Sequence, residues 1–288
     1  MKWNATRRSD PAVLVAVTAI CVGELALAQT PPCDALTPEQ QQAKQAVFAA
    51  LHPYDGCDAT FEQCLAKKPV SPVVLRLASD ICRQVKAGRG KQEIEHGLAK
   101  RAQSALAMGK PSAIAIDSGT LAGDPQAPVQ VVVYACVRCP YCRVVIPILH
   151  REVTEGSLKG KARLYFRQFP LKDHQGSTEG GLALVAASRL GGFWPYMLKI
   201  YERYDVYCPK LLPDWAAETG LDKAALEGLV ADPKTREFLV ASKQEGIRNK
   251  VTATPTLFID GHKYLYDMQS EVIIDVLHEV YEARSAAK

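Results

Sequence analysis

Three cysteines at three-residue intervals are the most informative feature of this sequence. Cys136, Cys139 and Cys142 form two overlapping Cys-x-x-Cys motifs, and the second one reads Cys139-Pro140-Tyr141-Cys142. Such a dithiol can exchange disulfides when one of its sulfurs is a thiolate, because the thiolate is the form that attacks a disulfide bond. The spacing therefore predicts thiol–disulfide exchange. Metal binding through soft thiolates is the competing chemistry.

The elements around the second motif favour the redox chemistry. Residues 129–134 are almost continuously apolar and β-branched, which predicts a strand buried on both faces, and residues 140–155 predict the helix that follows. The first cysteine then lies at a helix N-terminus, where unpaired N–H groups and the helix dipole favour an anion. We therefore expect Cys139 to be the nucleophile. Cys142, one turn later, would resolve the mixed disulfide.

Four further residues are candidates for contact with a substrate. Pro140 suits the first helical position because it needs no N–H partner there, and Tyr141 modulates the motif. Thr254-Pro255 lies just before an apolar stretch, and a proline adopts a cis peptide bond at modest cost. A cis Pro255 facing the dithiol would leave backbone groups free to pair with an extended substrate.

The remainder of the C-terminal region has an α/β pattern. Several prolines and glycines within 110–128 fit a linker and an entry strand, and Asp260-Gly261 is a strong hairpin signal. We expect a strand, a long helical stretch, a hairpin and a closing helix, in that order, over residues 163–167, 178–250, 256–266 and 271–283.

This region resembles the DsbA/DsbG-like thioredoxin-fold thiol–disulfide oxidoreductases of the bacterial envelope. The resemblance covers about residues 113–288 and rests on five stretches in the family's order, which are 123–129, 139–142, 166–171 with His174, 193–194 and 251–256. It implies a thioredoxin fold with an inserted helical domain at about 175–250. It also implies Cys139 as nucleophile, Cys142 as resolving thiol, Pro255 as cis and Thr254 in contact with the substrate. Glutaredoxins carry the same Cys-Pro-Tyr-Cys but lack the helical insert.

Cys136 departs from the pattern of that family, which usually has a polar or acidic residue there. The cysteine triple could bind copper(I) or zinc, which would make the protein a metal-binding chaperone. An iron–sulfur site would need a further cysteine where the chain has Ile146. A third interpretation pairs Cys136 with Cys208, the only other cysteine of the C-terminal region.

Other conspicuous residues have ordinary structural interpretations. Thiol exchange needs no dedicated base once the thiolate has formed, so we interpret His174 as a loop or packing residue. Phe193 and Trp194 are expected in the core of the insert, and the run 243–250 is expected to be a solvated helix face.

The first 28 residues have the pattern of a secretory signal peptide. A basic start precedes an apolar run at 12–22, and Ala26-Leu27-Ala28 fits cleavage before Gln29. The apolar run is short of the roughly 20 residues that a membrane span needs. We therefore expect a periplasmic protein, soluble after cleavage, in a compartment where disulfides persist.

Residues 29–109 are expected to form a small, wholly helical region. Prolines at helix starts and glycines after helix ends predict helices at 38–51, 60–67, 72–88 and 91–108. The region carries Cys33, Cys57, Cys64 and Cys82, which we expect to form two disulfides, although the sequence does not choose among the three pairings. The region could dimerise the protein, dock a partner or act as a spacer.

Composition limits the range of functions. The chain has 288 residues with 48% hydrophobic and 23% charged side chains, as in ordinary globular proteins. Its 35 basic and 31 acidic residues give a formal net charge of +4, so nothing points to nucleic acid. We predict an α/β protein-disulfide oxidoreductase at residues 110–288, without cofactor or metal and with oxidase or isomerase activity favoured over reductase activity. Its partners would be cysteine-containing envelope proteins and a membrane redox partner that resets the dithiol.

Overall fold

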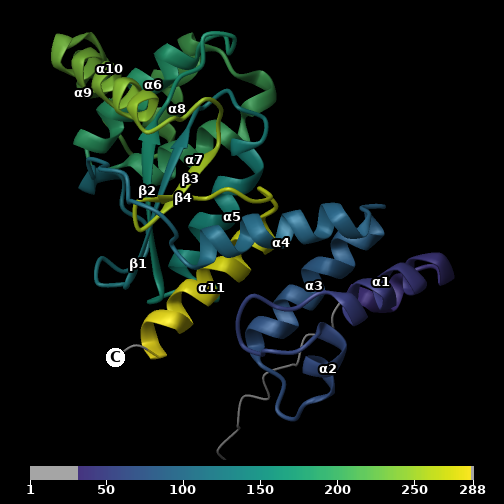
Figure 1. The fold of residues 1–288 in the computed structure, drawn as a ribbon. Coiled ribbons are helices and arrows are strands. Elements are labelled where there is room, and N and C mark those ends of the chain that lie inside the picture. Colours follow the sequence, from purple (N-terminus) through teal and green to yellow (C-terminus); the bar gives the residue numbers. More distant parts are fainter. Residues whose placement is uncertain (1–31, 287–288) are drawn as a thin grey trace, which may run out of the picture. The chain divides into compact units, whose positions relative to one another are not determined.

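A four-stranded sheet forms the centre of the C-terminal region (Figure 1). The computed structural model describes residues 32–286, so the predicted signal peptide lies outside the described residues. The strand order is β2-β1-β3-β4. β1 runs parallel to β2 and antiparallel to β3, and β3 is antiparallel to β4. The bounds are Val129–Ala135, Ala162–Gln168, Thr256–Ile259 and His262–Lys263.

The central strand β1 is buried on both faces, as its composition predicts. Val131 and Val133 belong to the main core, to which α5 (Cys142–Thr154) and α11 (Ser270–Ala286) also contribute side chains. Val132 and Tyr134 point to the opposite face and pack in a second cluster. This alternation follows from the two-residue period of a strand. Because both faces of β1 are packed, the end of the strand that leads into the cysteine motif is held in place.

The helical insert is present between β2 and β3, and Figure 1 shows its helices gathered beyond one end of the sheet. Phe193 and Trp194 are buried there, which confirms their prediction as core residues. The Trp194 indole also donates to the Thr120 carbonyl at 3.0 Å, so its polar atom is satisfied. The insert contains α6 to α10, at Ser177–Arg189, Phe193–Glu202, Leu212–Glu218, Lys223–Ala231 and Pro233–Arg248.

Two expectations about strands need correction. The entry strand expected within 110–128 is not formed, and this stretch contributes only an isolated bridge between Ala122 and Leu164. The second hairpin strand ends at Lys263 rather than at residue 266. It ends because the Leu265 N–H donates to the Ser104 hydroxyl at 2.9 Å and leaves the ladder. The turn itself matches the prediction, since Asp260 and Gly261 both have positive φ, at 52° and 83°.

The N-terminal region consists of four α-helices, as predicted. They are α1 to α4, at Pro38–Ala50, Phe61–Ala66, Pro72–Lys86 and Lys91–Ala105. Thr37 and Thr60 begin α1 and α2 with reciprocal capping boxes. The structure also selects the disulfides, which join Cys33 to Cys82 and Cys57 to Cys64.

The N-terminal helices pack directly on the C-terminal helix α11. The fully buried Arg101 of α4 contacts Asp80 of α3 at 3.1 Å and Glu279 of α11 at 2.6 Å. The described residues belong to one compact unit, so a domain boundary at residue 109 stays a prediction. Within residues 32–286, no helix is both long and apolar enough to cross a membrane.

Candidate active site

The turn after β1 presents the cysteine motif at the start of α5. The Cys139 N–H donates to the Cys136 carbonyl at 3.1 Å, and the Arg143 N–H donates to the Cys139 carbonyl at 3.2 Å. α5 begins at Cys142, so Pro140 precedes the first helical residue instead of occupying it, which corrects the prediction. The Cys142 N–H, at the helix N-terminus, points to the Cys139 sulfur at 3.4 Å. Cys139 is therefore placed where a helix terminus stabilises a thiolate.

The predicted proline element faces the dithiol. The Thr254-Pro255 peptide bond is cis, and the Cys139 thiol donates to the Thr254 carbonyl at 3.1 Å. The Thr254 hydroxyl is buried and has no hydrogen-bond partner among the described residues. It is thus a donor available to a Cys139 thiolate. The structure brings Cys139, Cys142 and Thr254 together, with Pro255 adjacent.

The two thiols of the motif have opposite electrostatics. The pKa of Cys139 is lowered from 9.0 to about 6, chiefly by a hydrogen bond with the Cys142 thiol and against the effect of its own burial, with Thr254 helping. Burial raises the pKa of Cys142 well above 9.0, and the neighbouring Cys139 adds to that effect. At neutral pH the pair is a thiolate beside a protonated thiol. That is the state in which one sulfur attacks and the other waits.

Exposed apolar side chains lie in the cysteine motif, in the first turn of α5 and in an insert segment joined to that helix. Tyr141, Val144 and Val206 have exposed fractions of 71%, 57% and 65%, and we call these three residues the apolar rim. Val206 belongs to the insert, and the ion pair of its neighbour Asp205 with Arg143 of α5, at 2.8 Å, holds it at this side of the helix. Pro140 is exposed as well. Pro140 and Tyr141 are therefore both exposed to solvent, and their contact with a substrate stays a prediction.

An arginine and tyrosine stack joins the motif to the insert, and sequence reasoning missed it. The Arg138 guanidinium lies over the rings of Tyr204 and Tyr207, at 4.4 and 4.7 Å from their centroids, and donates to the Tyr204 carbonyl at 2.7 Å. Arg143 lies 4.3 Å from the Tyr204 centroid. Cation–π contacts of this kind fix the segment 204–207 against the turn. The tyrosine-rich composition of that segment was the available signal.

The third cysteine is free and buried, and it has its own partners. Cys136 and Cys208 are both unpaired in this structure, so the proposed disulfide between them is not formed. The Cys136 sulfur lies 3.4 Å from His174 Nδ1 and accepts the Arg138 N–H at 3.4 Å. Its pKa is raised by burial. Within residues 32–286, no group of three or more His, Cys, Asp or Glu side chains is arranged to hold a metal ion.

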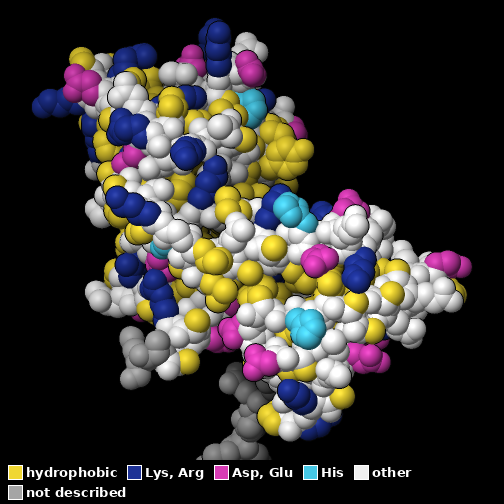
Figure 2. Space-filling model, in the orientation of Figure 1, with side chains coloured by type: hydrophobic (Ala, Val, Ile, Leu, Met, Phe, Trp, Pro, Cys, Tyr) yellow, Lys and Arg dark blue, Asp and Glu magenta, His cyan; other side chains and the backbone are white. Residues whose placement is uncertain are grey.

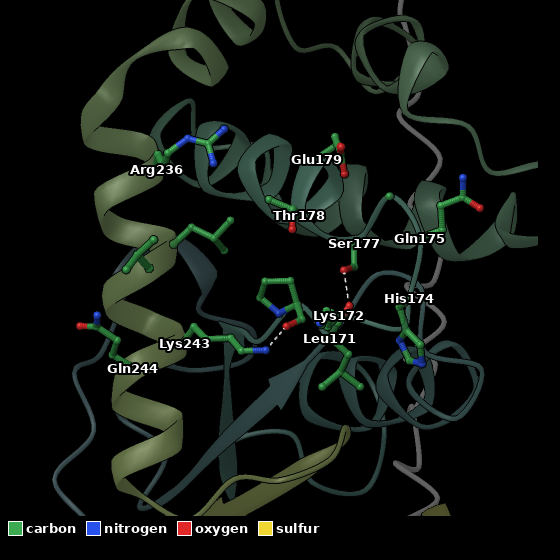
Figure 3. A pocket seen from close by; sticks show the side chains of 14 residues that line it. Leu171, Lys172, His174, Gln175, Ser177, Thr178, Glu179, Arg236, Lys243 and Gln244 are labelled. Carbon is green, nitrogen blue, oxygen red and sulfur yellow. Dashed lines mark hydrogen bonds between the residues drawn. The ribbon is translucent and has the colours of Figure 1, made fainter.

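A cavity of about 470 Å³ lies behind Cys136, between the loop before α6 and the helix α10 (Figure 3). His174 and Ser177 form part of its wall, and Figure 3 shows Lys243 reaching across from α10 to the carbonyl of Pro170. The run 243–250 is thus only partly a solvated face, because Lys243 and Glu245 both point inward. His174 lies on a loop as expected, but its contact with Cys136 goes beyond packing.

Comparison with known proteins agrees with this geometry. The family model Thioredoxin_4, described as thioredoxin, matches residues 117–277. The chain belongs to this thioredoxin family. Crystalline oxidised BdbD from Bacillus subtilis superimposes with a TM-score of 0.51 at 20% identity, covering 60% of this chain and 97% of that one. The predicted thioredoxin fold is therefore confirmed, as is the resemblance to DsbA-like proteins at the level of family and fold.

Two curated relatives of this thioredoxin-family chain differ in how much of their length is matched. A probable disulfide bond formation protein D of Bacillus anthracis is 27% identical over 157 residues, which is 49% of this chain and 69% of that protein. The Na(+)/H(+) antiporter NhaA 3 of Salinispora tropica is 27% identical over 149 residues, which is 51% of this chain. The match spans only 22% of the antiporter.

Proposed function

We propose that this thioredoxin-family chain is a protein-disulfide oxidoreductase whose reactive group is the Cys139–Cys142 dithiol. The observation that carries the proposal is the opposite protonation of two adjacent thiols beside a cis-proline loop. Cys139 forms a mixed disulfide with the substrate in one of two ways. Either its thiolate attacks a substrate disulfide, or a substrate thiolate attacks the Cys139–Cys142 disulfide. The Cys142 thiol resolves the mixed disulfide at Cys139 in the reducing direction, and it is the group that leaves Cys139 when a substrate thiolate attacks the disulfide in the oxidising direction. No organic cofactor takes part in this chemistry.

The direction we propose is that of an oxidase or isomerase. A nucleophile with a pKa of about 6 is ionised at neutral pH, which stabilises the reduced dithiol relative to the disulfide. A stabilised reduced form makes the disulfide a stronger oxidant. The buried Thr254 hydroxyl, which lacks another partner, favours the same thiolate.

The substrates we propose are cysteine-containing envelope proteins that are not yet folded. The apolar rim offers exposed apolar surface next to a reactive sulfur, and such surface fits the apolar side chains of an unfolded chain. The unfolded chain would lie extended along the cis-proline loop, as a strand adds to a sheet edge. The signal-peptide pattern supports a periplasmic location, where a membrane redox partner would reset the dithiol.

The reduction potential of the Cys139–Cys142 pair tests the proposed direction. It is measured by equilibration in glutathione buffers followed by alkylation of free thiols. A Cys208→Ser protein is used so that the Cys208 thiol does not contribute to the alkylation signal. We expect a potential well above the roughly −270 mV of thioredoxin and closer to the roughly −120 mV end of the range. A potential near that of thioredoxin would instead identify a reductase.

Two active-site variants test the proposed roles. Cys139→Ser should abolish oxidation of a reduced, unfolded model substrate. A protein with both Cys136→Ser and Cys142→Ser, mixed with a disulfide-containing unfolded substrate, should accumulate substrate linked to Cys139, visible as a band on non-reducing gels that disappears with reductant. Full turnover by the Cys139→Ser protein would refute the proposed function.

A further inference from the structure

We propose that Cys136 is a second resolving thiol, which attacks the mixed disulfide at Cys139 while His174 accepts its proton. This inference rests on the proposed function, because it needs a mixed disulfide at Cys139. It gives a role to the cysteine that distinguishes this chain from the family pattern. It also gives a role to a histidine that the exchange at Cys142 does not use.

A backbone turn holds Cys136 and Cys139 close together, at the two ends of one hydrogen-bonded segment. The hydrogen bond from the Cys139 N–H to the Cys136 carbonyl closes a turn, and such turns bring their end Cα atoms within about 7 Å. Disulfides span Cα separations of about 4.4–6.8 Å. Burial is the main cause that raises the pKa of Tyr201, and the charges of Cys142, Cys136 and Cys139 add to it, so the three cysteines lie in the neighbourhood of one hydroxyl.

Cys136 has the partners that a resolving thiol needs. Cys142, which has the accepted position for this role, is a buried thiol with a raised pKa, and Cys136 is likewise buried with a raised pKa. Cys136 additionally has His174 Nδ1 at 3.4 Å, which can take the thiol proton, and the Arg138 N–H, which supports the sulfur as it becomes negative. An imidazole beside a thiol is a general way to activate it.

An unpartnered amide in the same enclosure is a second and independent observation. The Gln168 side chain is 1% exposed, and within residues 32–286 neither its oxygen nor its nitrogen has a hydrogen-bond partner. It lines the same small enclosed space as Cys136 and Ser177. A buried polar group without a partner costs free energy. A Cys136 thiolate that forms during exchange would supply an acceptor for the Gln168 amide.

The cavity behind His174 gives the proton a route to water. His174 is part of the wall of this open cavity of about 470 Å³, as Figure 3 shows, while Cys136 on the other side of the imidazole is 3% exposed. The imidazole therefore connects a buried sulfur to solvent. Protonation and deprotonation at His174 do not require the active site to open.

The proposed step is balanced without any added oxidant. The Cys136 proton passes to His174, and the thiolate attacks the Cys139 sulfur of the mixed disulfide. The Cys136–Cys139 bond forms as the bond from Cys139 to the substrate breaks, and the substrate thiolate leaves and takes up a proton. Cys142 can then attack Cys139, which restores the Cys139–Cys142 disulfide and the Cys136 thiol.

A chromogenic aromatic disulfide, dithionitrobenzoate, provides the test because each exchange step releases one coloured thiolate. All proteins begin at Gln29 and carry Cys208→Ser, so that among the described residues only the motif cysteines are free. In the Cys142→Ser protein, Cys139 should release a first equivalent and Cys136 a second, slower one. The protein with both Cys136→Ser and Cys142→Ser should release the first equivalent only. Adding His174→Gln to the Cys142→Ser protein should slow the second release at least tenfold and leave the first unchanged.

Peptide mapping identifies the bond without altering Cys136. Trypsin cleaves after Arg138, so a Cys136–Cys139 disulfide links two tryptic fragments, whereas a Cys139–Cys142 disulfide lies within one. We expect the linked fragments in the Cys142→Ser protein. A single released equivalent and a stable adduct at Cys139 would overturn this inference and leave the proposed function intact. Absence of the first equivalent would refute the proposed function itself.

Discussion

The ionisation of Cys139 couples the chemistry of this protein to its stability. The thiol has a pKa of about 6 in the folded reduced protein and an ordinary value of 9.0 when unfolded. Between these values the unfolded state binds the additional proton, so the stability of the reduced protein should rise with pH. The contribution is complete above about pH 9, and it is lost as the pH falls through about 6.

Melting temperatures of reduced wild-type protein and reduced Cys139→Ser protein check this coupling. The melting temperature of the wild-type protein should rise relative to that of the variant as the pH is raised from about 6 to about 9, because only the wild type has the thiol with the lowered pKa. The two structural disulfides of the N-terminal region must stay intact while the Cys139–Cys142 disulfide is reduced. A mild reductant is therefore used and is then removed by gel filtration. A difference that stays flat across this range would contradict the assigned pKa.

The redox residues could be predicted from the sequence, but their partners could not. Cys139, Cys142 and the cis Pro255 belong to short motifs whose chemistry is set by residue type and spacing. The contact between Cys136 and His174 joins residues 38 positions apart and depends on how the loop before α6 folds. The acceptor for the Cys139 thiol is a backbone carbonyl, which no side-chain pattern identifies.

At the scale of elements, a glycine allows α6 to approach the active-site turn. A Cβ atom on Gly180 would overlap Val137 of the turn and lie 2.6 Å from the hydroxyl oxygen of Tyr207. Tyr207 is also part of the stack with Arg138. We predict that Gly180→Ala destabilises the protein by about 1–3 kcal/mol through overpacking, as measured by urea unfolding.

Gly228 in α9 provides the matched control for that substitution. It is also a helical glycine, but a Cβ atom there would meet nothing within 4 Å. Gly228→Ala should therefore stabilise the protein by about 0.5–1 kcal/mol, because alanine loses less backbone entropy in a helix. Equal effects of the two substitutions would show that α6 does not pack tightly against the active-site turn at Gly180.

Helices were more predictable than strands in this chain. The N-terminal helices have local start and stop signals, such as the prolines that begin α1 and α3, and their observed bounds agree with the expected ones within a few residues. The entry strand and the end of β4 depended on pairing with distant partners. The Ser104 hydroxyl that ends β4 lies 161 positions away in the sequence, so no local pattern could reveal it.

At the scale of the whole molecule, the two disulfides of the N-terminal region should contribute unequally. Cys33–Cys82 closes a loop of 49 residues, and Cys57–Cys64 closes one of 7. The loss of chain entropy in the unfolded state gives about 4 kcal/mol for the longer loop and about 2 kcal/mol for the shorter. Urea unfolding of the two paired Cys→Ser variants should show that order. The reverse order would mean that the unfolded chain keeps structure near residues 33–82.

On the face drawn in Figure 2, hydrophobic side chains gather over α4, near the place where the N-terminal helices meet the remainder of the protein. Leu106, Met108 and Leu265 are exposed apolar side chains of α4's end and of the loop after β4. The contact between the two regions is nevertheless polar at its centre. Arg101 bridges α3 and α11 there, and its carboxylate partners are almost fully buried.

This buried cluster gives a last prediction, that the N-terminal region is part of the folding unit and no mere spacer. Arg101→Met would leave the carboxylates of Asp80 and Glu279, with exposed fractions of 3% and 5%, without their main partner. Asp80 keeps Arg83 and Glu279 keeps Arg76 as remaining ion partners, both at 3.5 Å. Removing one partner from a buried ion cluster costs up to about 3–5 kcal/mol. The control is Lys223→Met, which removes an exposed ion pair with Asp214 and should not change the unfolding curve.

Urea unfolding, monitored separately in the N-terminal helices and in the C-terminal region, tests whether Arg101 couples the two regions. If Arg101 couples the regions, the Arg101→Met protein should unfold at lower urea, with the N-terminal helices detaching before the thioredoxin fold. The wild-type protein should show one transition for both. An unfolding curve of the Arg101→Met protein that matches the Lys223→Met control would mean that the cluster does not couple them, and the N-terminal region could then be deleted without cost to the redox domain.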